Sequence, residues 1–153
     1  MTNTHTTARK TDHYLRTLVA LAAMLMASGA ALAATDTTAP RVTSTLPQPG
    51  EFIVDTSANV KATFSEGMKA STVNGSTFKL FQKGSTTKLG ASVSYDATAH
   101  TATLDPTNSL KIGAAYKAVV TTGAKDLAGN SLDQNSSKVG NQAKTWTFTV
   151  ART

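Results

Sequence analysis

This sequence contains no cysteine, and aromatic residues make up only 6% of its 153 residues. Without cysteine the chain has no disulfide, thiol nucleophile, iron–sulfur cluster or cysteine-ligated zinc site, so its stability must come from packing and backbone pairing. Acidic residues are also few, at 9 against 15 lysines and arginines. The single tryptophan, Trp146, lies in an alternating run near the C-terminus, and we expect it in the core.

Long hydrophobic runs are rare too, and the one present lies near the N-terminus. Residues 18–33 read LVALAAMLMASGAALA and follow the basic residues Arg9, Lys10 and Arg16. A basic segment, a short apolar segment and a final A-L-A are typical of a cleavable secretory signal peptide. The alternative is a membrane anchor, but the run is shorter than the ~20 apolar residues that a spanning helix needs.

We therefore expect a signal peptide at residues 1–33, a flexible lead-in at residues 34–39 and one domain at residues 40–151. Cleavage would leave no stable membrane span. The protein is then expected outside the cytoplasm, whether secreted, at the cell surface or periplasmic.

The rest of the chain shows period-2 alternation, in which apolar residues alternate with Thr, Ser and Lys. This pattern predicts antiparallel strands with one face in water. No helical period extends beyond a turn or two near residues 68–73. The predicted strands are residues 41–46, 60–65, 78–82, 92–96, 101–104, 116–121 and 146–150. About seven short strands in about a hundred residues predict an all-β fold, an immunoglobulin-like Greek-key sandwich.

Tyr116 sharpens this prediction, because it begins a strand just after Gly113. In Greek-key sandwiches a tyrosine at this place turns its hydroxyl back to a backbone group a few residues upstream, which is the tyrosine corner. The alternative is that Tyr116 is an ordinary aromatic residue of the core.

Several segments together carry a family resemblance. In order they are PRVTSTLPQPG, KATFSEGMKASTVNGSTFKL, SYDATAHTATLDPTNSLKIGAAYKAVVTTGAKDLAGNSL and TWTFTV. Over residues 40–150 they resemble the bacterial Ig-like domain of the SbsA (S-layer protein) type. The resemblance implies a β-sandwich outside the cytoplasm and no catalytic residues. Similar domains are modules of S-layer proteins, adhesins, secreted enzymes and some ice-binding proteins.

The stretch DLAGN raises the question of a metal site. Asp126 is placed to accept backbone N–H groups in an Asx-type turn, and Gly129 tolerates a positive φ. We expect Leu127 and Leu132 to pack inward on either side of this turn. The alternative is a calcium site with Asp126, Asn130 and Asp133 as ligands, but calcium takes six to eight oxygens and this spacing supplies few carboxylates. A turn is therefore the favoured interpretation, and no cofactor is expected.

Other candidate sites are weaker. His100 lacks the nucleophile motif that a catalytic triad would need, and nothing places Glu51 and Glu66 in a common cleft. Five lysines between Lys61 and Lys88 suggest a patch for acidic polymers, or simply a solvated sheet face. Because no arginine, tryptophan or tyrosine interleaves these lysines, nucleic acid is not expected as a partner. We predict no catalytic residues.

Residues 133–144 form a long polar segment before the last predicted strand, and long loops of such scaffolds often carry recognition. We therefore predict a structural, adhesive or protein-interaction module at the cell envelope, whose partner is an unidentified extracellular or envelope protein or polysaccharide. The alternative is a carbohydrate- or calcium-binding accessory domain. The candidate interaction residues are Asp133, Gln134, Asn135, Lys138, Asn141 and Lys144.

Overall fold

The computed structural model describes residues 35–53 and 55–151, so the predicted signal peptide lies outside the described residues. These residues form eight strands and one short 3-10 helix, η1 (Ala70–Thr72). The strands are β1 (Val42–Leu46), β2 (Phe52–Ile53), β3 (Val60–Phe64), β4 (Phe78–Gln82), β5 (Ala91–Asp96), β6 (Thr101–Pro106), β7 (Ala115–Val120) and β8 (Lys144–Val150).

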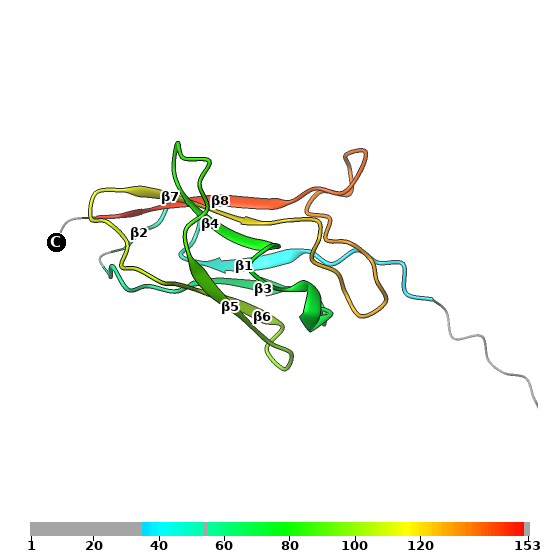
Figure 1. Cartoon of the computed structure of the whole chain (residues 1–153). Helices are drawn as coiled ribbons and strands as arrows, with labels where there is room; N and C mark the ends of the chain where they lie inside the picture. The colour runs from blue at the N-terminus through cyan, green and yellow to red at the C-terminus, as the bar shows by residue number, and fades with distance from the viewer. Residues whose placement is uncertain (1–34, 54, 152–153) are drawn as a thin grey trace, which may run out of the picture. The chain divides into compact units, whose positions relative to one another are not determined.

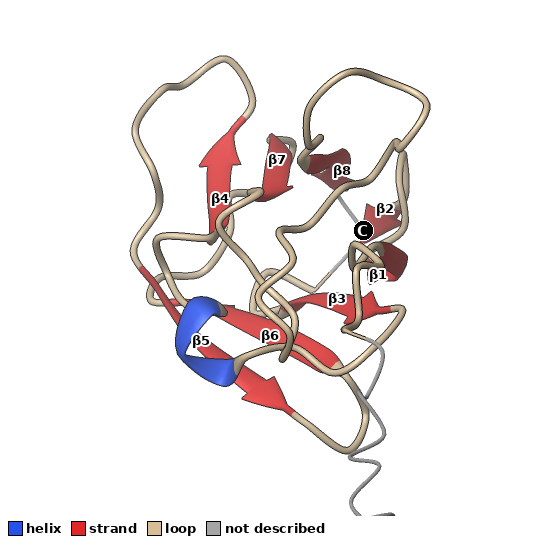
Figure 2. Ribbon diagram, turned by 90° about the vertical axis from the view of Figure 1, so that its right-hand side faces the viewer, coloured by secondary structure: helices blue, strands red, loops and turns tan. Residues whose placement is uncertain are grey.

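The strands make two four-stranded sheets that face one another (Figures 1 and 2). Sheet I has the order β1-β3-β6-β5, and sheet II has the order β2-β8-β7-β4. All pairs are antiparallel except β2 with β8, which is parallel. This is the strand order of an immunoglobulin-like sandwich, so the predicted all-β fold is confirmed.

The alternation seen in the sequence becomes the inside and outside of the sandwich. In β7, Tyr116, Ala118 and Val120 are buried, while the residues between them are half-buried on the outer face. Buried side chains from both sheets form one hydrophobic cluster, which also includes Trp146 and Phe148 of β8. Thr and Lys point outward because an antiparallel sheet can leave one face in water.

The sequence analysis did not predict β2. After β1 the chain passes Pro47 and Gly50, the latter with φ +80°, and then pairs with β8 in the opposite sheet. The first strand is therefore divided between the two sheets. A strand of two residues shows no alternation, which is why the pattern could not reveal it.

The described residues contain no helix long and apolar enough to span a membrane. The described chain enters the sandwich at the end that carries η1 and the 133–144 loop, and it leaves at the opposite end (Figure 1).

Candidate functional site

The turn at residues 126–130 is built around a buried carboxylate. Asp126 is only 1% exposed. Its Oδ1 accepts the backbone N–H groups of Gly129, at 2.6 Å, and Asn130, at 2.8 Å. Its Oδ2 accepts the side-chain amide of Asn130 at 2.8 Å. A buried charge needs such donors, and here the turn itself supplies them.

Two neighbours complete the turn. Gly129 has φ +99°, a backbone conformation that side-chain-bearing residues rarely adopt. Leu132 is fully buried, as expected. Leu127 is 78% exposed, so the expectation that it packs inward is wrong. The tight turn directs the Asp126 carboxylate inward and turns Leu127 outward, where its Cδ1 lies over Gly67.

The three residues considered as calcium ligands lie in two separate hydrogen-bond networks. The side-chain amide of Asn130 donates to Asp126 and also to the backbone carbonyl of Asp36, the latter at 3.1 Å. Asp133 instead holds the base of the next loop, where its Oδ1 accepts the N–H groups of Asn135 and Gln142, each at 3.0 Å.

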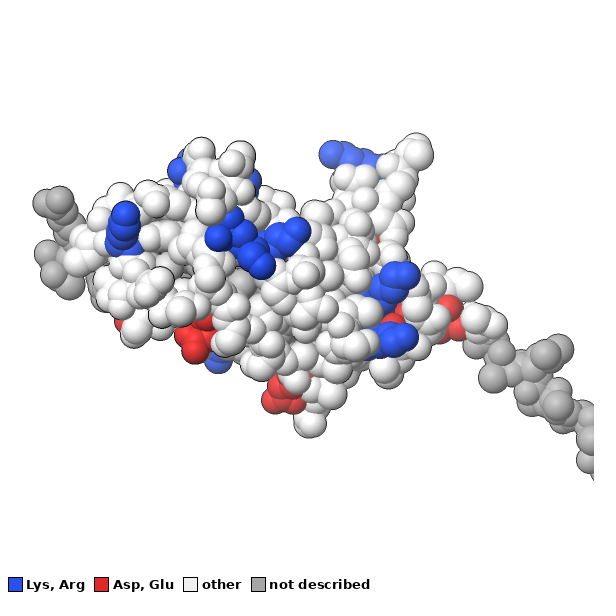
Figure 3. Space-filling view, viewed as in Figure 1, with Lys and Arg blue, Asp and Glu red and all other residues white. Residues whose placement is uncertain are grey.

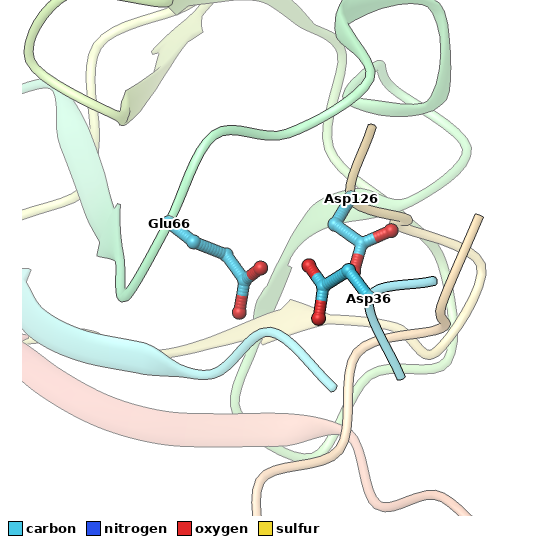
Figure 4. A group of neighbouring side chains, drawn as sticks. All are labelled: Asp36, Glu66 and Asp126. Atoms are coloured by element: carbon cyan, nitrogen blue, oxygen red, sulfur yellow. The ribbon is translucent and has the colours of Figure 1, made fainter. Parts of the chain in front are cut away.

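Two other carboxylates, from Asp36 and Glu66, meet Asp126 (Figure 4). One oxygen from each of the three lies within 4.8 Å of the others, and we call this group the acidic cluster. The sequence could not reveal it, because these residues are far apart along the chain and only the fold brings them together. Three carboxylates are the hard oxygen ligands that divalent cations prefer, but they fall short of a calcium shell.

The acidic cluster perturbs Glu66. Burial raises the pKa of this carboxyl above its usual value, and the charges of Asp36 and Asp126 raise it further. A hydrogen bond from Ser65 and the nearby His100 act in the opposite direction but do not outweigh these effects. Removing carboxylates from water and placing like charges together both favour the protonated form.

Tyrosine side chains tie loops to the sheets at two places. The hydroxyl of Tyr116 accepts the backbone N–H of Lys111 at 2.7 Å, which is the geometry of a tyrosine corner. The turn before it contains Gly113, whose φ is +78° and whose N–H donates to the carbonyl of Val150. The sequence analysis did not single out Tyr95, whose hydroxyl accepts the N–H of Met68 at 2.8 Å.

Trp146 is 3% exposed and packs against Phe78, with ring centroids 6.0 Å apart. Its indole Nε1 has no hydrogen-bond partner among the described residues. Its low exposure places the tryptophan in the core, as expected, and it stabilises the fold through packing rather than through an indole hydrogen bond.

The 133–144 loop, which projects from the sandwich in Figure 1, has an anchored base and an exposed tip. The side chain of Gln134 accepts the N–H of Val42 at 3.0 Å and donates to its carbonyl at 3.1 Å, as a neighbouring strand would. Asp133 and Gln134 therefore hold the loop. Near the tip, the side chain of Gln142 donates to the carbonyls of Val139 and Gly140, and Val139 is fully exposed.

The remaining candidate interaction residues lie along this loop. Asn135, Lys138 and Asn141 are exposed, whereas Lys144 is half-buried at the start of β8. The sequence analysis did not include Val139, because a single valine among polar residues gives no periodic signal.

None of the residues considered for catalysis lines either of two hollows found among the described residues. A shallow hollow of about 400 Å³ lies on the outer face of sheet I and is lined mainly by Thr, Ser and Lys61. Neither His100, Glu51 nor Glu66 lines it. His100 lies in the β5–β6 turn with φ +50°.

Structural comparison finds similar folds in S-layer and copper-resistance proteins. The N-terminal part of the S-layer protein SbsC is 28% identical with a TM-score of 0.54, and the match covers 74% of this chain and 24% of that one. The longer rSbsC(31-844) is also 28% identical, with a TM-score of 0.53 and coverage of 74% and 14%. This chain thus spans less than a quarter of the length of these S-layer structures.

The methionine-rich copper resistance protein PcoC from Escherichia coli is 20% identical, with a TM-score of 0.54 and coverage of 74% of this chain and 99% of that one. At this identity the likeness concerns the fold alone. The described residues of this chain contain one methionine, Met68, which is buried.

No match was found among curated protein sequences. The family model described as the bacterial Ig-like domain matches residues 36–150, which include both sheets, the acidic cluster and the 133–144 loop. The chain therefore belongs to the bacterial Ig-like domain family.

Proposed function

We propose that this protein is a non-enzymatic module that acts outside the cytoplasm in a structural or adhesive role and contacts a protein partner through the tip of the 133–144 loop. The observation that carries the proposal is Val139, which is fully exposed at the tip of a loop held by side-chain hydrogen bonds. Burying this exposed apolar side chain against a partner would be favourable, because it removes apolar surface from water.

The arrangement of the loop supports this use. Gln134 fixes the base of the loop against β1, and Asp133 joins the two sides of the loop through Gln142, so binding would cost little ordering of the loop backbone. Lys138 and Asn141 flank the tip and supply polar groups for the rim of a contact.

The likeness to S-layer structures supports a structural role and a place outside the cytoplasm. The chain enters and leaves the sandwich at opposite ends, so a module of this shape suits linkage in series (Figure 1). We propose export through the predicted signal peptide, with Ala34 as the new N-terminus. Intact-mass measurement of the protein recovered outside the cytoplasm tests this cleavage.

The loop is tested by capture from an envelope extract with immobilised wild type, Val139→Asp and Ile112→Asp. Ile112 is a matched control, because it is 57% exposed and lies in the turn before β7 at the opposite end of the sandwich. The proposal expects a protein that wild type and Ile112→Asp retain and that Val139→Asp loses. Equal retention by all three would contradict it.

A further inference from the structure

We propose that the outer face of sheet II binds an anionic polysaccharide through four lysines gathered around Phe81. This inference rests on a surface separate from the 133–144 loop and does not depend on the function proposed above.

The four lysines converge through strand register. Lys79 lies two residues before Phe81, so these two side chains project on the same side of β4, and Lys83 follows β4 in the turn, where its backbone N–H donates to the carbonyl of Ala115 in β7 at 2.8 Å. Lys117 of β7 pairs directly with Phe81, and Lys88 pairs with it from the other side through an isolated bridge. We call Lys79, Lys83, Lys88 and Lys117 the lysine face.

Phe81 organises the centre of the lysine face. The Nζ of Lys117 lies 5.1 Å from the centroid of the Phe81 ring, within the range of a cation–π contact. The Nζ of Lys88 donates to the carbonyl of Gly75 at 2.9 Å. Two of the four ammonium groups are therefore held in place rather than moving freely in solvent.

No carboxylate neutralises this face from within its own strands. The segments FKLFQ, AYKAVV and KTWTFTV, which form β4, β7 and β8, contain no acidic residue. Acidic side chains occur instead on sheet I, where Asp96 and Asp105 are exposed on β5 and β6. Figure 3 shows basic side chains over β4 and β7, with the acidic ones mostly along the side that carries β5 and β6.

Like charges on neighbouring positions of a sheet repel one another. Lys79 lies diagonally across from Lys117, the β7 partner of Phe81, and such diagonal neighbours are about 7–8 Å apart, which is close to the Debye length of about 8 Å at physiological salt. A polyanion lying across the strands would relieve this repulsion and displace counterions.

The lining favours a polysaccharide over other polyanions. The outward side of β8, which pairs with β7, carries Thr145, Thr147 and Thr149, and Thr147 pairs directly with Lys117. Their hydroxyl groups can hydrogen-bond to a hydroxylated polymer. Among the described residues the one arginine is Arg41, which precedes β1 in the opposite sheet, and Phe81 is already covered by Lys117. The face thus lacks the arginines and open aromatic platforms with which proteins grip nucleic acids.

Binding to polygalacturonate, compared with neutral dextran, tests the proposal. The protein is expressed from the full sequence, and the product is purified after whatever processing the cell carries out. One variant carries Lys79→Gln, Lys83→Gln and Lys117→Gln. The control carries Lys61→Gln, Lys69→Gln and Lys125→Gln, which removes the same charge from exposed positions outside the lysine face. Thermal melts check that both variants fold.

We expect wild type to bind polygalacturonate but not dextran, and binding to weaken as salt rises. The first variant should lose affinity by at least about tenfold and the control by less than about threefold, since only the first removes charges that face the polymer. If the first variant does not fold, the pair Lys83→Gln and Lys88→Gln, both at exposed positions, replaces it.

Equal loss in the two variants, equal binding of dextran, or tighter binding to duplex DNA or to phosphatidylglycerol vesicles than to polygalacturonate would overturn the proposal. Val139→Asp should leave polymer binding unchanged. This variant therefore distinguishes a failure of the polysaccharide proposal from a failure of the proposal for the 133–144 loop.

Discussion

The hydroxyl of Tyr116, at the start of β7, accepts a hydrogen bond from the backbone N–H of Lys111 at 2.7 Å. Tyr116 is 2% exposed, and its ring stacks on Phe148 with centroids 5.7 Å apart. One side chain thus packs in the core and satisfies a backbone donor of the loop that crosses from sheet I to sheet II.

Tyr116→Phe should destabilise the protein by about 1–3 kcal/mol, because the ring remains while the Lys111 N–H loses its buried acceptor. The free energy of unfolding from urea titration measures this effect. A change within experimental error would mean that Tyr116 acts only as a core aromatic residue.

Gly129→Ala should destabilise the protein by about 1–2 kcal/mol, since φ is positive there and an L side chain resists it. An added Cβ at Gly129 meets no atom within 4 Å, so the cost is conformational. Gly75→Ala is the matched control, because its φ is not positive and its Cβ would make only ordinary contact with Lys88. Equal melting temperatures for the two variants would be inconsistent with a strained turn.

Glu66 should make the protein more stable as the pH falls toward its usual pKa of 4.5. Its pKa is raised in the folded state by burial and by Asp36 and Asp126, so the folded state gains protons at a higher pH than the unfolded chain does. Ionised Glu66 therefore destabilises the folded state above the raised pKa. This destabilisation is removed as the pH drops through that pKa and Glu66 becomes protonated.

Glu66→Gln should thus melt at a higher temperature than wild type at pH 7, and the difference should shrink toward pH 4. Asp105→Asn is the control, as it removes one exposed carboxylate from β6. A constant difference between Glu66→Gln and wild type across this pH range would argue against the repulsion.

Calcium should leave the melting temperature unchanged, because Asp126 already accepts three hydrogen bonds within its own turn. A bound ion would instead stabilise the folded state by about 2.7 kcal/mol at a hundredfold excess over its dissociation constant. Melts in calcium and in chelator distinguish these outcomes. A calcium-dependent rise that disappears in Glu66→Gln and Asp126→Asn would show that the acidic cluster binds the ion.

The alternation of apolar and polar residues determined the all-β fold and most of its strands. The period of two is a local property, set by side chains that point to opposite faces of a strand. The same local reasoning identified Tyr116 as a corner residue, and the structure shows the hydrogen bond that this role requires.

The tertiary structure alone decided which distant residues meet. The acidic cluster joins residues from three separate segments, and the lysine face joins β4 with β7 and with the loop before β5. Strand pairing between segments far apart in sequence creates both groups, and no local pattern encodes that pairing. Leu127 likewise points outward because the hydrogen bonds of Asp126 and Asn130 set the direction of the turn, which apolarity alone does not determine.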